Sequence, residues 1–153
     1  MSAVLKNLPE LGVMSDADVP AVAAIEQTIY THPWSEGNFA DSLRAAYDCR
    51  TWRMQGELIG YFVLATGAGE AHLLNLSVAA AHQRRGHGAA LLREAARLAR
   101  SRGAQAVFLE VRPSNHAGQR LYTRFGFRKV GLRRDYYPAA AGREDALVLA
   151  LTL

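Results

Sequence analysis

The sequence predicts a mixed α/β (α+β) fold in which helices cover both faces of a central sheet. Hydrophobic periodicity switches several times between helix and strand spacing along the 153 residues. The segment 57–65 is apolar on both faces, which is typical of a central strand covered from two sides. The sequence contains no repeats or low-complexity tracts, and its length suits one domain, so we expect a single domain over 1–153.

Each expected element rests on its own local signal. Asp18 and Ser35 are typical helix N-caps, and Pro20 is tolerated in a helix only in the first turn. Gly103 is placed to end the longest helix. In chain order we expect strand 10–14, helices 19–29 and 36–47, strands 49–54, 57–65 and 72–78, helix 89–102, strand 106–111, helix 114–125, and strands 127–133 and 146–153, in the order β-αα-βββ-α-β-α-ββ.

Composition excludes several classes of protein. No apolar stretch approaches the roughly 18–20 residues of a membrane span, and the N-terminus shows no apolar signal segment, so we expect a cytoplasmic protein without a membrane partner. The single cysteine, Cys49, cannot form an internal disulfide and is expected to be a buried apolar residue. The five histidines show no metal-ligand spacing with cysteines or carboxylates, so we expect no metal.

The net charge of +4 is unevenly distributed along the chain. Residues 51–153 hold 15 of the 18 lysines and arginines, and seven of these lie between Glu110 and Asp135, where no acid occurs. Such a stretch favours an anionic partner, because long-range electrostatics selects the sign of a partner's charge. Charge does not choose among RNA, DNA, a phosphorylated cofactor and an acidic membrane surface.

The first candidate site is the glycine loop Gln83-Arg84-Arg85-Gly86-His87-Gly88, between an expected strand and helix. Two glycines let the backbone approach a ligand, and a helix N-terminus adds partial positive charge, so the loop suits a phosphate or pyrophosphate. The loop lacks the Gly-Lys-Ser/Thr of an ATP-binding loop, and Leu91 stands where a dinucleotide fingerprint needs a third glycine or alanine. The alternative is a tight connection with His87 as a surface side chain.

The second candidate is Glu110, a carboxylate in the otherwise apolar strand 106–111. Strand alternation places Phe108, Glu110 and Arg112 on one face. Desolvation at such a position raises the pKa of a carboxyl group toward the range of a general base. The alternative is a structural glutamate that pairs with Arg112 or Arg84.

The third candidate is the pair Asn115 and Tyr122, seven residues apart on one expected helix and therefore on the same face. Both side chains can point at one ligand. The alternatives are a helix-start residue for Asn115 and a core aromatic for Tyr122.

Together these motifs resemble the GNAT family of N-acetyltransferases. The resemblance rests on Leu76-Ser77-Val78, the glycine loop, and Asn115 followed by Leu121-Tyr122 and Gly126-Phe127, with Gly118 where the family usually has alanine. It implies a single-domain GNAT fold with a mixed, mostly antiparallel sheet, and acetyl-coenzyme A as cosubstrate. In the family, the glutamate matching Glu110 accepts a proton and the tyrosine matching Tyr122 donates one. The implied coenzyme contacts are Leu76, Ser77, Val78, Arg84, Arg85, Gly86, His87, Gly88, Ala89 and Asn115.

Three further segments, His32–Glu36, Leu109–Asn115 and Arg133–Ala146, resemble the bacterial ribosomal-protein-alanine N-acetyltransferases, the RimI group. This likeness implies acetylation of a protein N-terminal α-amine, that of the alanine of a basic small-subunit ribosomal protein. Trp34 and Tyr137 are then the expected walls of a peptide groove. We expect four acids to lie near that groove and to attract a basic N-terminal sequence: Glu26, Glu36, Asp41 and Asp135.

The expected mechanism is direct attack of the amine in a ternary complex, since Cys49 lies outside every matching motif. An α-amino group has a reference pKa of about 7.7–8.0 against about 10.4 for lysine, so it is the easier nucleophile near neutral pH. A backbone N–H near Val78 is the expected donor to the carbonyl oxygen. No direct nucleic-acid contact is required. Two alternatives stay open: an acetyltransferase of lysine side chains or small-molecule amines, and a non-catalytic coenzyme A-binding module.

Overall fold

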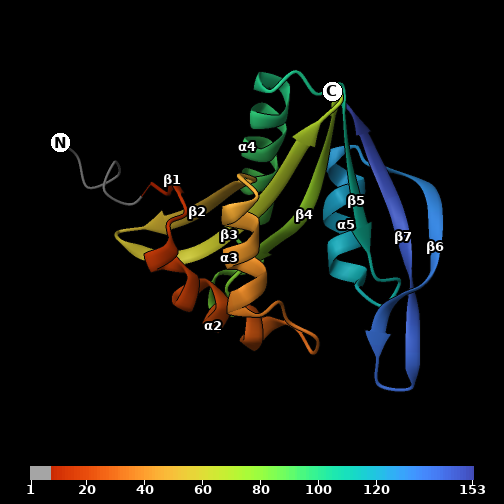
Figure 1. The fold of residues 1–153 in the computed structure, drawn as a ribbon, viewed down its shortest axis with the longest axis horizontal. Helices are drawn as coiled ribbons and strands as arrows, with labels where there is room; N and C mark the ends of the chain where they lie inside the picture. The colour runs from red at the N-terminus through yellow and green to blue at the C-terminus, as the bar shows by residue number, and fades with distance from the viewer. Residues whose placement is uncertain (1–7) are drawn as a thin grey trace. The chain divides into compact units, whose positions relative to one another are not determined.

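The computed structural model describes residues 8–153 (Figure 1). Its element order, β-αα-βββ-α-β-α-ββ, confirms the predicted order. The elements are β1 (Glu10–Val13), the 3-10 helix η1 (Asp16–Asp18), α2 (Val19–Ile29), α3 (Glu36–Arg44), β2 (Asp48–Met54), β3 (Glu57–Gly67), β4 (Glu70–Val78), the 3-10 helix η2 (Ala80–His82), α4 (His87–Ser101), β5 (Ala106–Val111), α5 (His116–Phe125), β6 (Arg128–Ala139) and β7 (Gly142–Thr152).

The described strands form one seven-stranded sheet in the order β1-β2-β3-β4-β5-β7-β6. The pairs β1·β2, β2·β3, β5·β7 and β6·β7 are antiparallel. β4 and β5 are parallel, and their pairing runs from Glu70 with Ala106 to His72 with Phe108. The predicted mixed, mostly antiparallel sheet is therefore confirmed.

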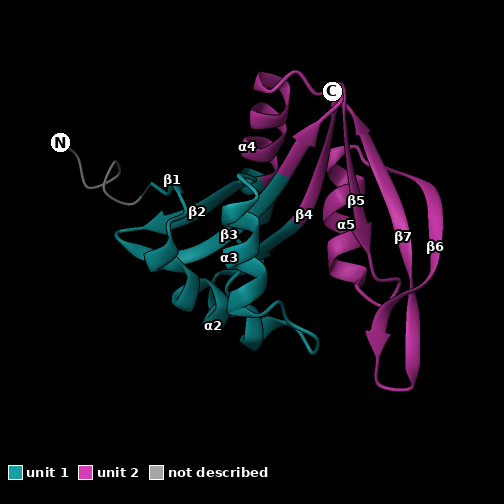
Figure 2. Cartoon of the chain, in the orientation of Figure 1, with its two compact units in different colours: residues 1–64, 75–91 teal, residues 65–74, 92–153 magenta. Residues whose placement is uncertain are grey.

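The chain divides into two compact units (Figure 2). Unit 1 comprises the chain up to Leu64 together with Asn75–Leu91, and unit 2 comprises Ala65–Leu74 and Leu92–Leu153. Unit 1 therefore holds the glycine loop, whereas unit 2 holds Glu110 and Tyr122. That 1–153 forms a single domain stays a prediction.

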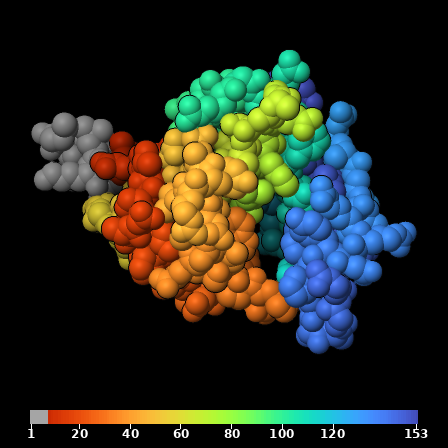
Figure 3. All heavy atoms as spheres, in the orientation of Figure 1, coloured from red at the N-terminus to blue at the C-terminus, as the bar shows by residue number. Residues whose placement is uncertain are grey.

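In unit 1, helices lie on both faces of β3. Tyr61 packs edge-to-face against Phe39 of α3, with ring centroids 5.6 Å apart. The neighbouring Gly60 points to the opposite face, where a Cβ would stand 3.0 Å from the side chain of Leu91 in α4. α3 therefore covers one face of β3, the face toward the viewer in Figures 1 and 3, and the start of α4 covers the other.

The core of unit 1 contains a buried carboxylate, Glu26 of α2, which is 2% exposed. Its Oε1 accepts hydrogen bonds from the Tyr61 hydroxyl at 2.8 Å and the Asn75 amide at 3.0 Å, and its Oε2 accepts one from the Trp34 backbone N–H at 2.9 Å. Such donors are required because an unpaired buried carboxylate is very unfavourable. Glu26 is not a surface charge, so the expectation that it attracts a basic peptide is wrong.

In unit 2, β5 shows the predicted alternation. Val107, Leu109 and Val111 are buried, whereas Phe108 and Glu110 lie on the opposite face. β5 pairs with β7 along its whole length, which places Glu110 opposite Val148. The pairing with β7 therefore holds the backbone of Glu110 and of the residues on either side of it.

The C-terminal hairpin is longer than predicted. β6 and β7 extend well beyond 127–133 and 146–153 toward each other. Arg133 pairs with Ala146, but Tyr137 pairs with Glu144, so β6 bulges between these two pairs. Asp135 lies in the bulge with a φ of +51°. The polar residues of this bulge break the apolar alternation from which a strand is predicted.

The helix caps match the sequence signals in part. Ser35 caps α3 as predicted, because its hydroxyl accepts a hydrogen bond from the Asn38 backbone N–H at 3.1 Å. Asp18 precedes α2, but its carboxylate binds the Ser15 backbone N–H at 2.9 Å and Arg53 at 2.8 Å instead of capping the helix. α3 ends at Arg44, before the predicted boundary, and the following Ala46 adopts a positive φ.

Gly60→Ala is expected to lower the free energy of unfolding by about 1–3 kcal/mol, the usual cost of overpacking a core. Its Cβ would stand 2.9 Å from the backbone carbonyl oxygen of Ser77, which cannot move as a side chain can. Gly67→Ala in the same strand is the matched control, because nothing lies within 4 Å of its Cβ. Chemical denaturation of both variants measures the effect, and equal unfolding midpoints would contradict it.

Candidate active site

The glycine loop lies in unit 1 between β4 and α4. Arg84 and Gly86 both adopt positive φ, +63° and +85°, so the backbone turns sharply before α4 begins at His87. Gln83 fastens the loop to the strand, since its Nε2 donates a hydrogen bond to the Val78 carbonyl oxygen at 3.0 Å. The loop is thus shaped by its backbone and tied to the end of β4.

The loop presents unused backbone donors. Within residues 8–153, the N–H groups of Arg85–Ala89 donate no hydrogen bond, and the first bond into the helix runs from Ala90 N–H to the Gly86 oxygen at 3.1 Å. A Cβ at Gly86 would meet nothing within 4 Å, so the loop has open space beside it. Free N–H groups at a helix N-terminus bind phosphates well. The loop therefore fits the pyrophosphate of a coenzyme.

His87 differs from the expected surface residue. It is 9% exposed, and its Nδ1 accepts a hydrogen bond from the indole N–H of Trp52 at 3.1 Å. Burial, with the charges of His82 and Arg85, lowers the pKa of His87, which agrees with a neutral ring that accepts a hydrogen bond. The ring of His87 belongs to the core of unit 1, and its backbone N–H remains for a ligand.

The end of β4 is held by a chain of polar side chains. Ser77 is 3% exposed, and its hydroxyl donates to the Asn75 side-chain oxygen at 2.8 Å while bonding the Tyr30 hydroxyl at 2.7 Å. Asn75 in turn donates to Glu26. Burial raises the pKa of Tyr30 to about 12, so its hydroxyl stays protonated. The predicted coenzyme contacts Leu76–Val78 therefore lie on backbone that the core of unit 1 holds in place.

In unit 2, two basic side chains hold Glu110, whose side chain is 8% exposed. Its Oε2 is hydrogen-bonded to Nε2 of His72 on β4, and its Oε1 lies 3.5 Å from Nε of Arg133 on β6. Arg112 pairs with Glu144 instead, at 3.2 Å. The suggested pairing of Glu110 with Arg112 is therefore wrong.

This environment lowers the pKa of Glu110. Burial alone would raise the pKa, but the hydrogen bond and charge of His72, together with the charge of Arg133, outweigh burial. The predicted upward shift is wrong, because the sequence of the strand does not show the basic groups that other strands bring to it. Glu110 is therefore ionised near neutral pH and able to accept a proton.

Glu110 and His72 line a cavity of about 500 Å³ in unit 2. Its walls come from β3, β4, β5, β6 and β7 and include Glu70, Phe108, Arg133 and Val148. The cavity has the size of a small-molecule site and combines apolar walls with a few charged groups. An amine can therefore reach a carboxylate here that is otherwise shielded from water.

α5 carries the other two predicted residues. Asn115 caps the helix, because its Oδ1 accepts a hydrogen bond from the Gly118 N–H at 2.9 Å. A Cβ at position 118 would stand 2.6 Å from the Asn115 amide nitrogen, so Gly118 makes room for this cap. Tyr122 is half-buried and packs edge-to-face on Phe127, with centroids 5.6 Å apart. Asn115 is therefore a helix-start residue, whereas Tyr122 is only half-buried and is not part of the buried core. The roles of both residues toward a ligand stay predictions.

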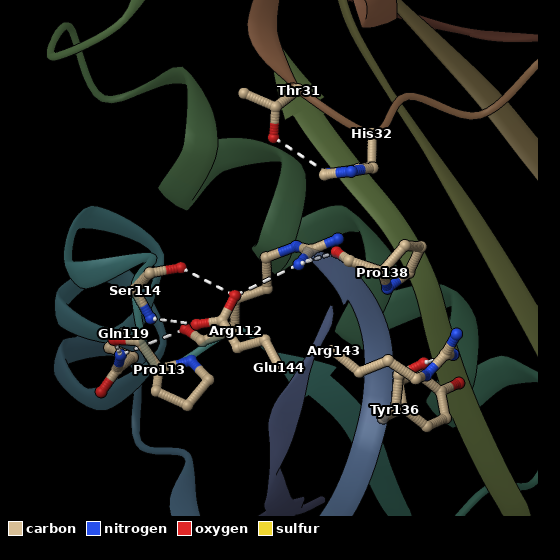
Figure 4. Close-up of polar contacts among 10 residues, drawn as sticks. All are labelled: Thr31, His32, Arg112, Pro113, Ser114, Gln119, Tyr136, Pro138, Arg143 and Glu144. Atoms are coloured by element: carbon tan, nitrogen blue, oxygen red, sulfur yellow. Dashed lines mark hydrogen bonds and ion pairs between the residues drawn. The ribbon is translucent and has the colours of Figure 1, made fainter. Parts of the chain in front are cut away.

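Tyr137, a predicted groove wall, lies beside the guanidinium of Arg112, with Cζ 4.3 Å from the ring centroid. Arg112 also donates to the Pro138 carbonyl at 2.8 Å and to Glu144, which accepts from the Ser114 N–H and hydroxyl, each at 3.0 Å (Figure 4). Burial raises the pKa of Tyr137, so its hydroxyl remains neutral. The contacts of Arg112 with the Tyr137 ring and with the Pro138 carbonyl thus hold the ring of Tyr137 on the β6–β7 hairpin.

Trp34, the other predicted wall, lies in unit 1 after α2. Its ring is half-buried and packs on Phe39, with centroids 5.1 Å apart. Trp34 therefore takes part in the packing of unit 1, and its contact with a peptide stays a prediction. Across 8–153, no group of three His, Cys, Asp or Glu side chains is arranged to hold a metal ion, and no helix is long and apolar enough to cross a membrane.

Comparison with known families decides the class of the protein. Residues 19–127 match the model of the acetyltransferase (GNAT) family. The chain belongs to the GNAT family of acetyltransferases. Among the relatives of this acetyltransferase, the [ribosomal protein bS18]-alanine N-acetyltransferase of Escherichia coli K12 is 36% identical over 140 residues, which are 92% of this chain and 95% of that protein.

Solved structures of GNAT enzymes share the fold. The crystal structure of the ribosomal-protein-S18-alanine N-acetyltransferase from Escherichia coli matches with a TM-score of 0.87 and 35% identity, over 95% of this chain and 94% of that one. Naa50 of Arabidopsis thaliana, in complex with the bisubstrate analogue CoA-Ac-MVNAL, matches with a TM-score of 0.81 and 17% identity, over 95% and 99%. At that identity Naa50 shows the fold alone. The predicted GNAT fold is confirmed.

Sequence reasoning missed the partner that holds the candidate base of this acetyltransferase. Metal-ligand spacing is the wrong test for His72, because its partner Glu110 lies 38 positions away on the neighbouring strand. The usable signal is a basic residue in an otherwise apolar strand, His72 in β4, which needs a partner on the same face of the sheet. The register that brings the two together is not visible in the sequence.

The lowered pKa of Glu110 predicts how stability depends on pH. Its stabilising effect is fully present above the ordinary glutamate value of 4.5 and is lost as the pH falls through the lower folded-state pKa. Glu110→Gln cannot ionise, so the stability of the wild type relative to this variant should decrease from pH 6 to about pH 3. Thermal unfolding across this range measures the difference, and a difference that grows in acid would contradict the lowered pKa.

Proposed function

We propose that this acetyltransferase transfers acetyl from acetyl-coenzyme A to the N-terminal α-amine of a protein. The observation that carries the proposal is the ionised, shielded Glu110 in the wall of a cavity of about 500 Å³. It occurs in a chain that is 36% identical to a [ribosomal protein bS18]-alanine N-acetyltransferase over nearly its whole length. By that likeness, the acceptor is the N-terminal alanine of a basic ribosomal protein in the cytoplasm.

Acetyl-coenzyme A supplies an acetyl thioester, which is an activated acyl group. The free N–H groups of Arg85–Ala89 hold the pyrophosphate, and this role is supported by their position at the start of α4. Leu76–Val78 and Asn115 contact the remainder of the coenzyme, as the family resemblance implies. The side chains of Arg84 and Arg85 are exposed and add positive charge at the loop.

Glu110 takes a proton from the acceptor amine, whose nitrogen then attacks the acetyl carbonyl directly. A backbone N–H near Val78 stabilises the charge on the carbonyl oxygen, and Tyr122 protonates the departing sulfur. The second proton of the attacking nitrogen leaves as the C–S bond breaks and restores the Tyr122 hydroxyl. Cys49 plays no part as a nucleophile, because it is 1% exposed and burial raises its pKa to about 11. Transfer therefore needs no covalent enzyme intermediate.

An α-amine is favoured over a lysine side chain because its reference pKa is lower, at about 7.7–8.0 against about 10.4. An α-ammonium also gains from the two carboxylates that line the cavity, Glu70 and Glu110. Tyr137 and Trp34 guide the following residues of the peptide. These features support an N-terminal acceptor, and the residue preference follows from the likeness to the relative.

Glu110→Gln keeps the size of the side chain and removes its basicity, whereas Tyr122→Phe removes the donor hydroxyl. Each variant is expected to lower kcat about 10²–10⁴-fold while the Kd of acetyl-coenzyme A stays nearly unchanged, because each acts in proton transfer. Steady-state kinetics and calorimetry measure the two quantities. Tyr47→Phe, at an exposed tyrosine of unit 1 to which no role is assigned, is the control and should keep full activity. Wild-type kcat in both variants between pH 6 and 9 would refute the assignment.

A peptide that begins with alanine and continues with basic residues should gain one acetyl group from acetyl-coenzyme A. The same peptide with a blocked N-terminus should gain none, even where it contains lysine, because the proposed acceptor is the α-amine. Intact mass spectrometry compares the two peptides at equal concentration. Acetylation of the blocked peptide at a similar rate would show that the enzyme acts on lysine side chains instead.

A further inference from the structure

The proposed mechanism assigns no role to the hydrogen bond between Glu110 and His72. We propose that His72 is a positioning residue for the general base: it fixes Oε2 of Glu110 and so leaves Oε1 to take the proton of the amine. The inference rests on the proposed function and adds a residue to it. His72 acts through Glu110 and does not itself touch the acceptor.

The two oxygens of Glu110 are held unequally. His72 Nε2 forms a direct hydrogen bond to Oε2, whereas Arg133 Nε stands 3.5 Å from Oε1, beyond the usual range of a good hydrogen bond. The Arg133 side chain is 57% exposed, so water competes for its charge. An incoming amine can therefore displace Arg133 from Oε1 far more easily than His72 from Oε2.

The sheet holds His72 in position for this contact. His72 of β4 pairs with Phe108 of β5. Glu110 follows Phe108 by two residues and therefore lies on the same face of β5. The side chains of all three residues line the cavity. β5 is bonded to β4 on one side and to β7 on the other. A side chain on such a paired strand is more narrowly placed than one on a loop, which suits a residue that orients a base.

Exposure separates the roles of the two residues. The His72 side chain is 37% exposed in the cavity wall, whereas Glu110 is 8% exposed. A carboxylate so shielded favours its neutral form unless a donor or cation compensates. His72 supplies that hydrogen bond, and so helps to keep Glu110 ionised when an acceptor fills the cavity and excludes water.

Other charged groups also face the pair, from three strands. Glu70 on β4 and Arg133 on β6 line the same cavity, and Arg112 follows the end of β5 directly. Tyr137 on β6 is close enough for the charge of Glu110 to act on its hydroxyl. Arg112 is committed to Glu144 and Tyr137, and Arg133 is mostly exposed. The hydrogen bond from His72 is therefore the strongest of these interactions with Glu110.

The proton transfer balances without His72 gaining or losing a proton. The N–H bond of the acceptor ammonium breaks, an O–H bond forms at Oε1, and the nitrogen lone pair becomes available to form the new C–N bond. His72 keeps its hydrogen bond to Oε2 throughout. The proton on Oε1 passes to water when the product leaves the cavity.

Two substitutions separate hydrogen bonding from charge. His72→Phe keeps a flat ring but removes the donor, and should lower kcat about 10–100-fold, part of the 10²–10⁴-fold that a general base contributes, with KM for both substrates within about twofold. His72→Gln keeps an N–H donor and should recover most of the lost kcat. The acidic limb of the kcat–pH profile should move to higher pH in His72→Phe, because Glu110 then protonates more easily.

Glu57→Gln is the matched control, since it breaks a second His–Glu pair, Glu57 with His82, at an exposed site in unit 1. It should leave kcat and the pH profile unchanged. Wild-type kcat and an unmoved acidic limb in His72→Phe would overturn the proposal. Equal kcat values for the phenylalanine and glutamine variants, both reduced, would also overturn it, because they would show that the hydrogen bond does not position the base.

A direct titration tests the pair without any acetyl transfer. In protein labelled with ¹³C at glutamate carboxyl groups, the Glu110 signal is identified by its absence in Glu110→Gln. Its titration midpoint should rise in both His72→Phe and His72→Gln, since both remove the imidazole that helps to lower the pKa of Glu110. The glutamine variant gives this result even where the phenylalanine variant does not fold. An unchanged midpoint would overturn the proposal. Loss of the proposed function alone would appear as an inactive wild type with a normal response of Glu110 to the His72 variants.

Discussion

The buried carboxylate of Glu26 is the interaction on which the architecture of unit 1 most depends. Its three donors come from the loop after α2, from β3 and from β4, so these segments must meet at one point in the core. A misplaced segment would remove one of these donors from a buried carboxylate, at a cost of about 1–3 kcal/mol or more. Asn75 and Ser77 extend the same network along β4 to the residues that we assign to coenzyme binding. One buried, hydrogen-bonded glutamate thus connects the core of unit 1 to the proposed coenzyme contacts on β4.

Glu110 in unit 2 shows how a second shielded carboxylate acquires a different role. Glu26 has donors on both oxygens and is 2% exposed. Glu110 has one oxygen bound firmly and one bound loosely, and it lines a cavity. Two carboxylates of similar exposure are therefore structural in one case and suited to proton transfer in the other, and the difference lies in their partners.

The sequence predicts the order of the elements because local periodicity and caps decide it, as at Ser35 and along β5. It misses features that arise from pairing between distant segments. The bulge in β6 is set by its register with β7, and the polar run at Arg133–Asp135 conceals the strand. The sequence predicts a raised pKa for Glu110, whereas its pKa is lowered, for the same reason: His72 and Arg133 come from other strands.

The glycine loop and the Glu110 cavity differ in which groups would contact a ligand. The loop works through backbone N–H groups, so its sequence signal is glycine, and its side chains are free for other uses such as the contact of His87 with Trp52. The cavity works through side chains on paired strands. A shift of one residue in the β4–β5 register would turn His72 away from Glu110, since successive strand residues point to opposite faces. The basicity of Glu110 therefore depends on the register that joins β4 to β5 in the sheet. A change in that pairing would alter the pKa of Glu110 while leaving its sequence motif intact.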